Sequence, residues 1–135
     1  RQHIDLGGKF WFEGYDLEHP TPLRPGDPLR VQLYWTVQDV VFESYTVFVQ
    51  VRQGDQKIAQ IDSLPLCANR PTFRWKRGEI VIDPYDLQIS PEAQPGTYTV
   101  YVGMYLAATG ERLEVLDAAG NPVRNEIAVA EITIE

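Results

Sequence analysis

Residues 69–79 carry the side chains of this chain that are best suited to binding chemistry. The stretch combines Trp75 with four of the chain's 12 basic residues: Arg70, Arg74, Lys76 and Arg77. This concentration occurs in a protein whose net charge is −7. An indole flanked by cations can stack on a sugar ring while guanidinium donors bind hydroxyl or phosphate oxygens. Trp75 and these basic residues are therefore a candidate ligand site.

The same stretch also has a purely structural interpretation. Phe73 and Trp75 would fold over an open end of the domain, and the basic side chains would face water or pair with nearby acids. Both interpretations stay open, and the structural one is preferred.

Three tyrosines form a second candidate surface. Tyr34, Tyr101 and Tyr105 alternate with apolar residues and therefore point away from the core if their segments are strands. If the two strands are neighbours, the three rings form an exposed aromatic patch, which can mark a binding face. Tyrosine also favours strands, so structure alone explains these residues as well.

Three carboxylates are a candidate cation site. Asp62, Asp83 and Asp86 flank the long connection 63–78 and would supply oxygen ligands for Ca²⁺ if they met at one end of the fold. The alternative is that these residues cap turns, as Asp residues near strand ends more often do. With two His and one Cys, the chain also lacks the ligands of a structural zinc site. We expect neither a metal nor another cofactor.

The sequence favours a protein that is not an enzyme. Nucleophilic catalysis needs a nucleophile, a base and an orienting group held together. The only histidines are His3, near one end, and His19, in a proline-rich segment. Neither lies where a strand end would hold it rigidly.

Composition narrows the possible partners. The acidic balance argues against nucleic acid and against docking on anionic lipid through charge alone. No apolar run approaches the roughly 20 residues of a membrane span, so we expect the domain itself not to be membrane-inserted. Cys67 is the only cysteine, which excludes an internal disulfide. The 135 residues fit a single domain, 1–135, and because the chain begins at Arg1 we expect a part of a longer protein.

Alternation with a period of two is the dominant pattern of the chain. In 97–106 the positions of Tyr98, Val100, Val102 and Met104 are apolar, and Thr, Tyr and Gly occupy the positions between them. The segments 30–37 and 45–52 show the same pattern, which places Trp35 in the core. A strand turns successive side chains to opposite faces, so each segment has one buried face. Such strands predict an antiparallel β-sandwich.

The turn signals complete the predicted architecture. Gly54-Asp55 predicts a hairpin, the prolines of 20–28 predict a segment that crosses between sheets or wraps an edge, and Ala130-Glu131 marks a predicted β-bulge. Tyr98 follows Pro95-Gly96 as in a tyrosine corner, whose hydroxyl binds upstream backbone. The prediction is an all-β, immunoglobulin-like or fibronectin-like antiparallel sandwich of about seven to nine strands without a disulfide. The predicted strands are 9–16, 29–38, 44–53, 57–62, 79–83, 96–107, 111–116 and 126–135.

Taken in order, several short segments resemble the β-sandwich domains at the C-termini of bacterial multi-spanning membrane proteins, many of them described as glycosyltransferase-like. The segments that carry this resemblance are Phe12-Glu13-Gly14-Tyr15, Pro25-Gly26-Asp27, Leu33-Tyr34-Trp35, Tyr45-Thr46-Val47-Phe48-Val49, Ala59-Gln60-Ile61-Asp62, Trp75-Lys76-Arg77-Gly78-Glu79 with Asp83, Pro95-Gly96-Thr97-Tyr98, Val102-Gly103-Met104-Tyr105 and Arg112-Leu113.

The resemblance implies an extracytoplasmic, non-catalytic domain that is tethered through a parent membrane protein. We therefore expect an accessory or interaction domain whose main partner is the rest of its parent polypeptide. The alternative is a carbohydrate-binding module, in which Trp75 or the three tyrosines stack on a glycan.

Overall fold

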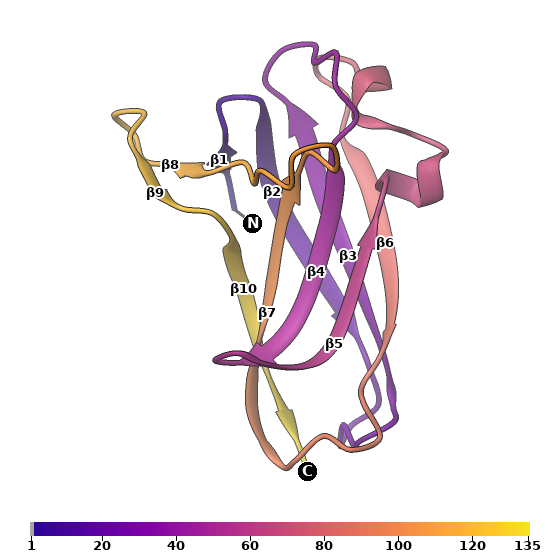
Figure 1. The fold of residues 1–135 in the computed structure, drawn as a ribbon. Helices are drawn as coiled ribbons and strands as arrows, with labels where there is room; N and C mark the ends of the chain where they lie inside the picture. Colours follow the sequence, from indigo (N-terminus) through magenta and orange to yellow (C-terminus); the bar gives the residue numbers. More distant parts are fainter. Residues whose placement is uncertain (1) are drawn as a thin grey trace.

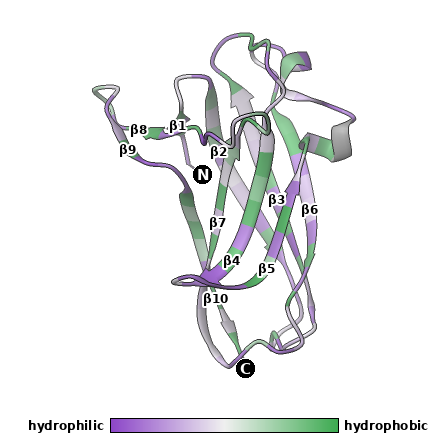
Figure 2. Cartoon of the chain, viewed as in Figure 1, coloured by the Kyte–Doolittle hydropathy of each residue, from purple (hydrophilic) through white to green (hydrophobic). Residues whose placement is uncertain are grey.

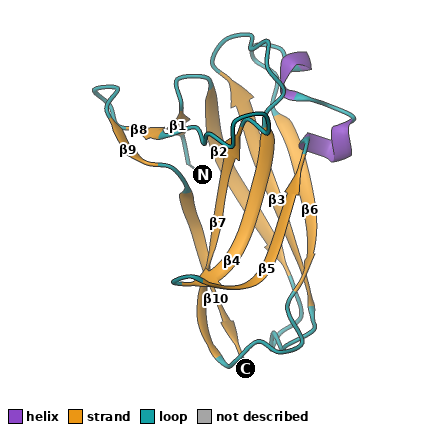
Figure 3. Ribbon diagram, viewed as in Figure 1, coloured by secondary structure: helices purple, strands orange, loops and turns teal. Residues whose placement is uncertain are grey.

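The computed structural model describes residues 2–135, apart from the side chains of residues 67 and 68, so Cys67 lies outside the described side chains. The chain forms two antiparallel sheets packed as a sandwich (Figures 1 and 3). One sheet has the strand order β6-β3-β2-β1-β8-β9 and the other β10-β7-β4-β5. The all-β sandwich predicted from the sequence is thus confirmed. No helix among residues 2–135 is long and apolar enough to span a membrane.

The strands are β1 (Ile4–Leu6), β2 (Phe10–Glu18), β3 (Pro28–Val37), β4 (Thr46–Gln53), β5 (Gln56–Ser63), β6 (Val81–Gln88), β7 (Gly96–Tyr105), β8 (Val115–Leu116), β9 (Pro122–Arg124) and β10 (Ile127–Ile134). Two short 3₁₀ turns, η1 (Pro65–Ala68) and η2 (Thr72–Arg74), lie in the connection between β5 and β6.

The core lies between the sheets, where the predicted alternation places the apolar side chains. Along β3, Leu29, Val31, Leu33 and Trp35 are completely buried, and the residues between them are more exposed. On β7, Val100, Val102 and Met104 face them from the other sheet. Figure 2 shows the resulting mixture of hydrophobic and hydrophilic residues along β4, β5 and β7.

Two local features predicted from the sequence, the tyrosine corner and the β-bulge, are confirmed. The buried Tyr98 donates its hydroxyl hydrogen bond to the backbone oxygen of Gln94 at 2.7 Å, as in a tyrosine corner. The register of β10 against β7 shifts between Ala128 and Ala130, beside the predicted position of the bulge. This shift keeps Val129 and Ile132 on the buried side of the strand.

The proline-rich segment 20–28 wraps an edge and does not cross between the sheets. It joins β2 to β3, which pair with each other in the six-stranded sheet. Leu23 forms a parallel bridge to Ile134 and accepts a backbone hydrogen bond from Glu135 at 3.0 Å. The segment therefore covers the β10 edge of the opposite sheet.

Two predicted strands need correction, and two strands of the structure were missed. The strand expected at 79–83 runs from Val81 to Gln88, and the one expected at 111–116 is reduced to β8 and an isolated bridge between Tyr105 and Arg112. The short strands β1 and β9 were not predicted. Each has only three residues, which is too short to show a period of two.

Gly103 allows an aromatic side chain to lie directly against the backbone of β7. It pairs with Phe48 on β4, and a Cβ at position 103 would come within 2.5 Å of the Phe48 ring. Phe48 points to the outer side of the four-stranded sheet, yet only 1% of it is exposed. The close approach therefore buries a phenyl ring on a face that is polar in most sandwiches.

We predict that Gly103→Ala lowers the free energy of unfolding by about 1–3 kcal/mol, because the methyl group collides with the Phe48 ring. Urea unfolding measures the effect. In the double variant with Phe48→Leu the collision is relieved, so the combined loss should be smaller than the sum of the two single losses. Strict additivity would contradict this account.

Candidate functional site

The structure places Trp75 in the core. It is 2% exposed, and its ring meets the Phe10 ring edge-on with centroids 5.4 Å apart. Its indole N–H donates a hydrogen bond to the backbone oxygen of Arg70 at 2.8 Å. The ring therefore presents no face to a ligand, and the sugar-stacking role considered for Trp75 is replaced by the structural one. Phe73, by contrast, is 46% exposed and does not fold inward with it.

The four basic residues around Trp75 divide into one structural residue and three exposed ones. A guanidinium nitrogen of Arg70 lies 2.6 Å from both carboxylate oxygens of Glu79. The hydrogen bond from Arg70, with one from the backbone N–H of Lys76, holds the pKa of Glu79 below its usual value. Arg74, Lys76 and Arg77 extend into solvent.

The three tyrosines do not form one patch. Tyr34 lies on β3 in the six-stranded sheet, whereas Tyr101 and Tyr105 lie on β7 in the four-stranded sheet. Their side chains therefore point away from the core on opposite faces of the sandwich. The hydroxyl of Tyr34 donates to Asp16 on its own sheet. Tyr101 and Tyr105 belong to a different environment, described below.

The three aspartates proposed for Ca²⁺ are held apart by separate partners. Asp62 accepts a hydrogen bond from the Tyr105 hydroxyl at 2.8 Å, and Asp86 pairs with Arg30 at 3.0 Å. Asp83 is completely buried. Within residues 2–135, apart from the undescribed side chains, no three His, Cys, Asp or Glu residues form a group that could hold a metal ion. The trio is therefore not a calcium site in this fold.

Asp83 instead fastens the connection between β5 and β6. Its carboxylate accepts a hydrogen bond from the backbone N–H of Leu66 at 2.9 Å and one from the Tyr85 hydroxyl at 2.7 Å. Leu66 has a backbone φ of 52°, an unfavourable value for a residue with a side chain. Burial raises the pKa of Asp83 above its usual value, and the hydrogen bonds that the carboxylate accepts oppose that rise only in part.

A series of neighbouring cavities lies on the outer face of the four-stranded sheet. A cavity of about 280 Å³ lies beside Asp62, Tyr105 and Gly110, and another of about 220 Å³ lies beside Arg52, Asp55 and Glu126. The two cavities share the side chains of Gln50, Lys57 and Arg112. We call this continuous surface the trough.

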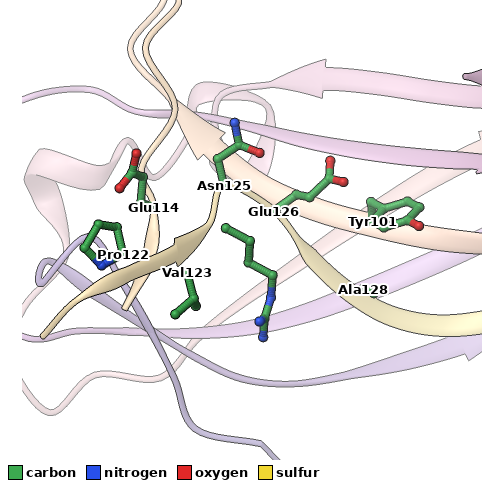
Figure 4. A pocket seen from close by; sticks show the side chains of 8 residues that line it. Tyr101, Glu114, Pro122, Val123, Asn125, Glu126 and Ala128 are labelled. Carbon is green, nitrogen blue, oxygen red and sulfur yellow. The ribbon is translucent and has the colours of Figure 1, made fainter. Parts of the chain in front are cut away.

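A third cavity of about 460 Å³ continues the trough toward β9 and shares Glu126 with it. Figure 4 shows its lining: Tyr101 comes from β7, Pro122 and Val123 from β9, and Glu126 from the turn before β10. The trough thus crosses the sheet from β5 to β10. Its floor follows one cross-strand row in the register, which is Gln60, Gln50, Tyr101 and Ala128.

A network of ions and aromatic rings builds the middle of the trough. Glu126 accepts hydrogen bonds from both Arg52 and Arg112. The Arg52 guanidinium lies 3.7 Å from the centre of the Tyr101 ring, and that of Arg112 lies 4.2 Å from the centre of the Phe48 ring. Each arginine therefore combines a charge pair with a cation–π contact.

The electrostatics of Glu126 follow from this network. Burial alone would raise the pKa of its carboxyl group, but the hydrogen bond and charge of Arg52, with the charge of Arg112, hold that pKa below its usual value. The carboxylate is therefore ionised at neutral pH. The hydroxyl of Tyr105 is held by Asp62, and this hydrogen bond raises the pKa of Tyr105.

The trough presents flat rings and planar hydrogen-bonding groups side by side. Asp62 also accepts a hydrogen bond from Gln60 at 2.8 Å, and Gln60 accepts one from Lys57 at 2.9 Å. These groups line a cavity and are fixed in position by one another. Such a surface suits a polar ligand with apolar ring faces.

Sequence reasoning found Tyr101 and Tyr105 but missed most of the trough. Phe48, Gln50 and Arg52 occupy the outward positions of the central strand β4. The large apolar side chain of Phe48 at such a position was the one signal in the sequence that the outer face is covered. Glu126 and Arg112 could not be assigned, because their meeting depends on the turns that follow β7 and precede β10. Neither known protein families nor curated proteins show a match to this chain.

We predict that Trp75→Ala lowers the free energy of unfolding by about 3–5 kcal/mol, because it removes a large buried ring. The matched control is Phe73→Ala in the same loop, which should change stability by no more than about 0.5 kcal/mol since half of that ring is already in water. Urea unfolding compares the two variants. Equal losses would contradict the different placement of the rings.

We predict that Asp83→Asn stabilises the protein most at neutral pH. The folded state raises the pKa of Asp83 above its unfolded value of about 3.9, so the folded state binds the proton more tightly than the unfolded state. The free energy of unfolding contributed by this group therefore falls as the pH rises from the unfolded-state pKa through the folded-state pKa. The asparagine keeps the acceptor for the Leu66 N–H and has no charge to bury. Urea unfolding from pH 4 to pH 8 should show an advantage that shrinks toward acid; a constant difference would refute the assignment.

Proposed function

We propose that this chain is a non-catalytic binding domain whose trough holds a glycan. The observation that carries the proposal is the continuous trough over the outer face of the four-stranded sheet, with Tyr101, Tyr105 and polar side chains along it. Sugars offer apolar C–H faces to aromatic rings and hydroxyl groups to amides, carboxylates and cations. Gln60, Asp62 and Lys57 supply those polar groups beside Tyr105.

The length of the trough favours a chain of sugar units over a single one. Its cavities succeed one another across β5, β4, β7 and β10. The neighbouring strands of a sheet are about 4.8 Å apart, so three strand spacings extend over about 14 Å, which exceeds one sugar ring. An elongated ligand that crosses the strands uses the whole surface.

The state of the carboxylates supports binding over catalysis. Glu126 is ionised between two arginines, and Asp62 is held by Tyr105 and Gln60. A general acid needs a carboxyl group that stays protonated near neutral pH. The lowered pKa of Glu126 opposes that role.

Glycan binding would also explain what an accessory domain, the role expected from the sequence, contributes to its parent protein. We propose that the domain belongs to a larger extracytoplasmic, membrane-associated protein and keeps a glycan close to the part of that protein that acts on it. The resemblance of the ordered segments from Phe12 to Leu113 supports this placement.

We predict that Tyr101→Ala and Tyr105→Ala each weaken glycan binding by about thirtyfold, as expected when an aromatic anchor worth about 2 kcal/mol is removed. A glycan array followed by calorimetry on the best binder measures the change. Tyr34→Ala is the matched control, because Tyr34 lies on the opposite face of the sandwich. Equal losses in all three variants, or no glycan bound by the unmodified protein, would overturn the proposal.

A further inference from the structure

Exposed apolar side chains, among them Val40, Phe42 and Phe73, lie in two loops at one end of the sandwich. The loops are 38–45, between β3 and β4, and 64–80, between β5 and β6, and both reach the upper end in Figure 1. Phe42 is 87% exposed and is the most exposed large hydrophobic residue among those described. Val40, in the same loop, and Phe73, in the other, are each nearly half exposed. We call this surface the tip.

The two loops of the tip are tied together. The Thr72 hydroxyl donates to the backbone oxygen of Glu43 at 2.6 Å and accepts from the backbone N–H of Tyr45 at 2.9 Å. Thr72 is completely buried, and Trp75 anchors the same loop in the core. Phe42 and Phe73 are therefore displayed on a fixed base.

The charges of the tip differ from those of the rest of the molecule. Arg74, Lys76 and Arg77 are exposed, and in the described part of the chain none of their side chains forms a close ion pair with a carboxylate, although the charge of Lys76 also acts on Glu79. The Arg74 guanidinium lies 5.9 Å from the centre of the Phe73 ring. Outside residues 70–77 the chain has 8 of its 12 basic residues against 19 acidic ones. An anionic surface would therefore attract this end, even with Asp39, Glu43 and the Arg70–Glu79 pair nearby, and repel the acidic body.

We propose that the tip docks on the surface of an anionic lipid bilayer, with Phe42 and Phe73 in the headgroup interface and Arg74, Lys76 and Arg77 against the phosphates. Charge complementarity selects this occupant: apolar rings beside unpaired cations match the layering of an anionic membrane surface. The shape of the tip agrees, because a protruding ring can enter a fluid interface without a complementary pocket. The domain would rest on the membrane without spanning it, and the trough would remain open.

Sedimentation of the 135-residue protein with lipid vesicles tests this proposal. The protein should bind vesicles of phosphatidylcholine mixed with phosphatidylglycerol and bind pure phosphatidylcholine far more weakly. Phe42→Ser should reduce binding about tenfold or more, because it removes a ring from the interface. The matched control is Val123→Ser, at an exposed apolar residue of β9 outside the tip, and it should bind as the unmodified protein does.

A charge variant separates the contribution of the cations. Lys76→Glu combined with Arg77→Glu should reduce binding to the mixed vesicles about twentyfold or more, since each cation near an anionic surface contributes about a factor of five. Both residues are exposed, so unchanged thermal unfolding verifies the fold. Absence of binding to the mixed vesicles, or equal losses in Phe42→Ser and Val123→Ser, would overturn the proposal. Tyr101→Ala should leave vesicle binding unchanged, so the failure of this proposal and that of glycan binding can be distinguished.

Discussion

The burial of the outer face of β4 is the constraint on which the rest of the structure depends. β4 is buried on both sides from Thr46 to Val51, although no third layer of strands lies over it in the described chain. Polar groups withdrawn from water in this way need partners. Arg52 donates a hydrogen bond to the buried Gln50, both Arg52 and Arg112 pair with Glu126, and both guanidinium groups also cover aromatic rings. The cover of β4 is thus made of charged side chains that satisfy one another.

The close approach of β4 and β7 sets the depth of the trough. Without a side chain at Gly103, the Phe48 ring lies on the sheet and the Arg112 guanidinium lies on that ring. Arg112 follows the turn at 106–111, whose ends are joined by the hydrogen bond from the Leu106 N–H to the Glu111 oxygen. The missing Cβ at position 103 thus allows the low position of the Phe48 ring on which Arg112 lies. A packing detail of the fold therefore shapes the candidate binding surface.

The sequence predicted the strands that have one clear buried face and failed where a strand departs from that rule. Asp83 and Pro84 interrupt the pattern of β6, since a carboxylate and a proline are unfavourable in a central strand. β6 is an edge strand in which Asp83 points inward to the Leu66 N–H and the Tyr85 hydroxyl, so both residues are tolerated. The trough could not be predicted, because it depends on the order of the strands in each sheet. Period-two alternation shows that Tyr34 and Tyr101 face outward, but it does not show that they lie in different sheets.

The segment 69–79, which the sequence singled out as one site, is divided by the fold into two environments. Trp75 closes the end of the core, and the hydrogen bond from its indole to the Arg70 oxygen fixes the loop around it. Trp75 is turned inward at the end of η2, and its neighbours Arg74 and Lys76 are exposed. The same anchoring that removes Trp75 as a ligand platform therefore presents the cations beside Phe73. Within this segment, the side chains suited to binding chemistry are accessible to a ligand only where they are not buried in the core.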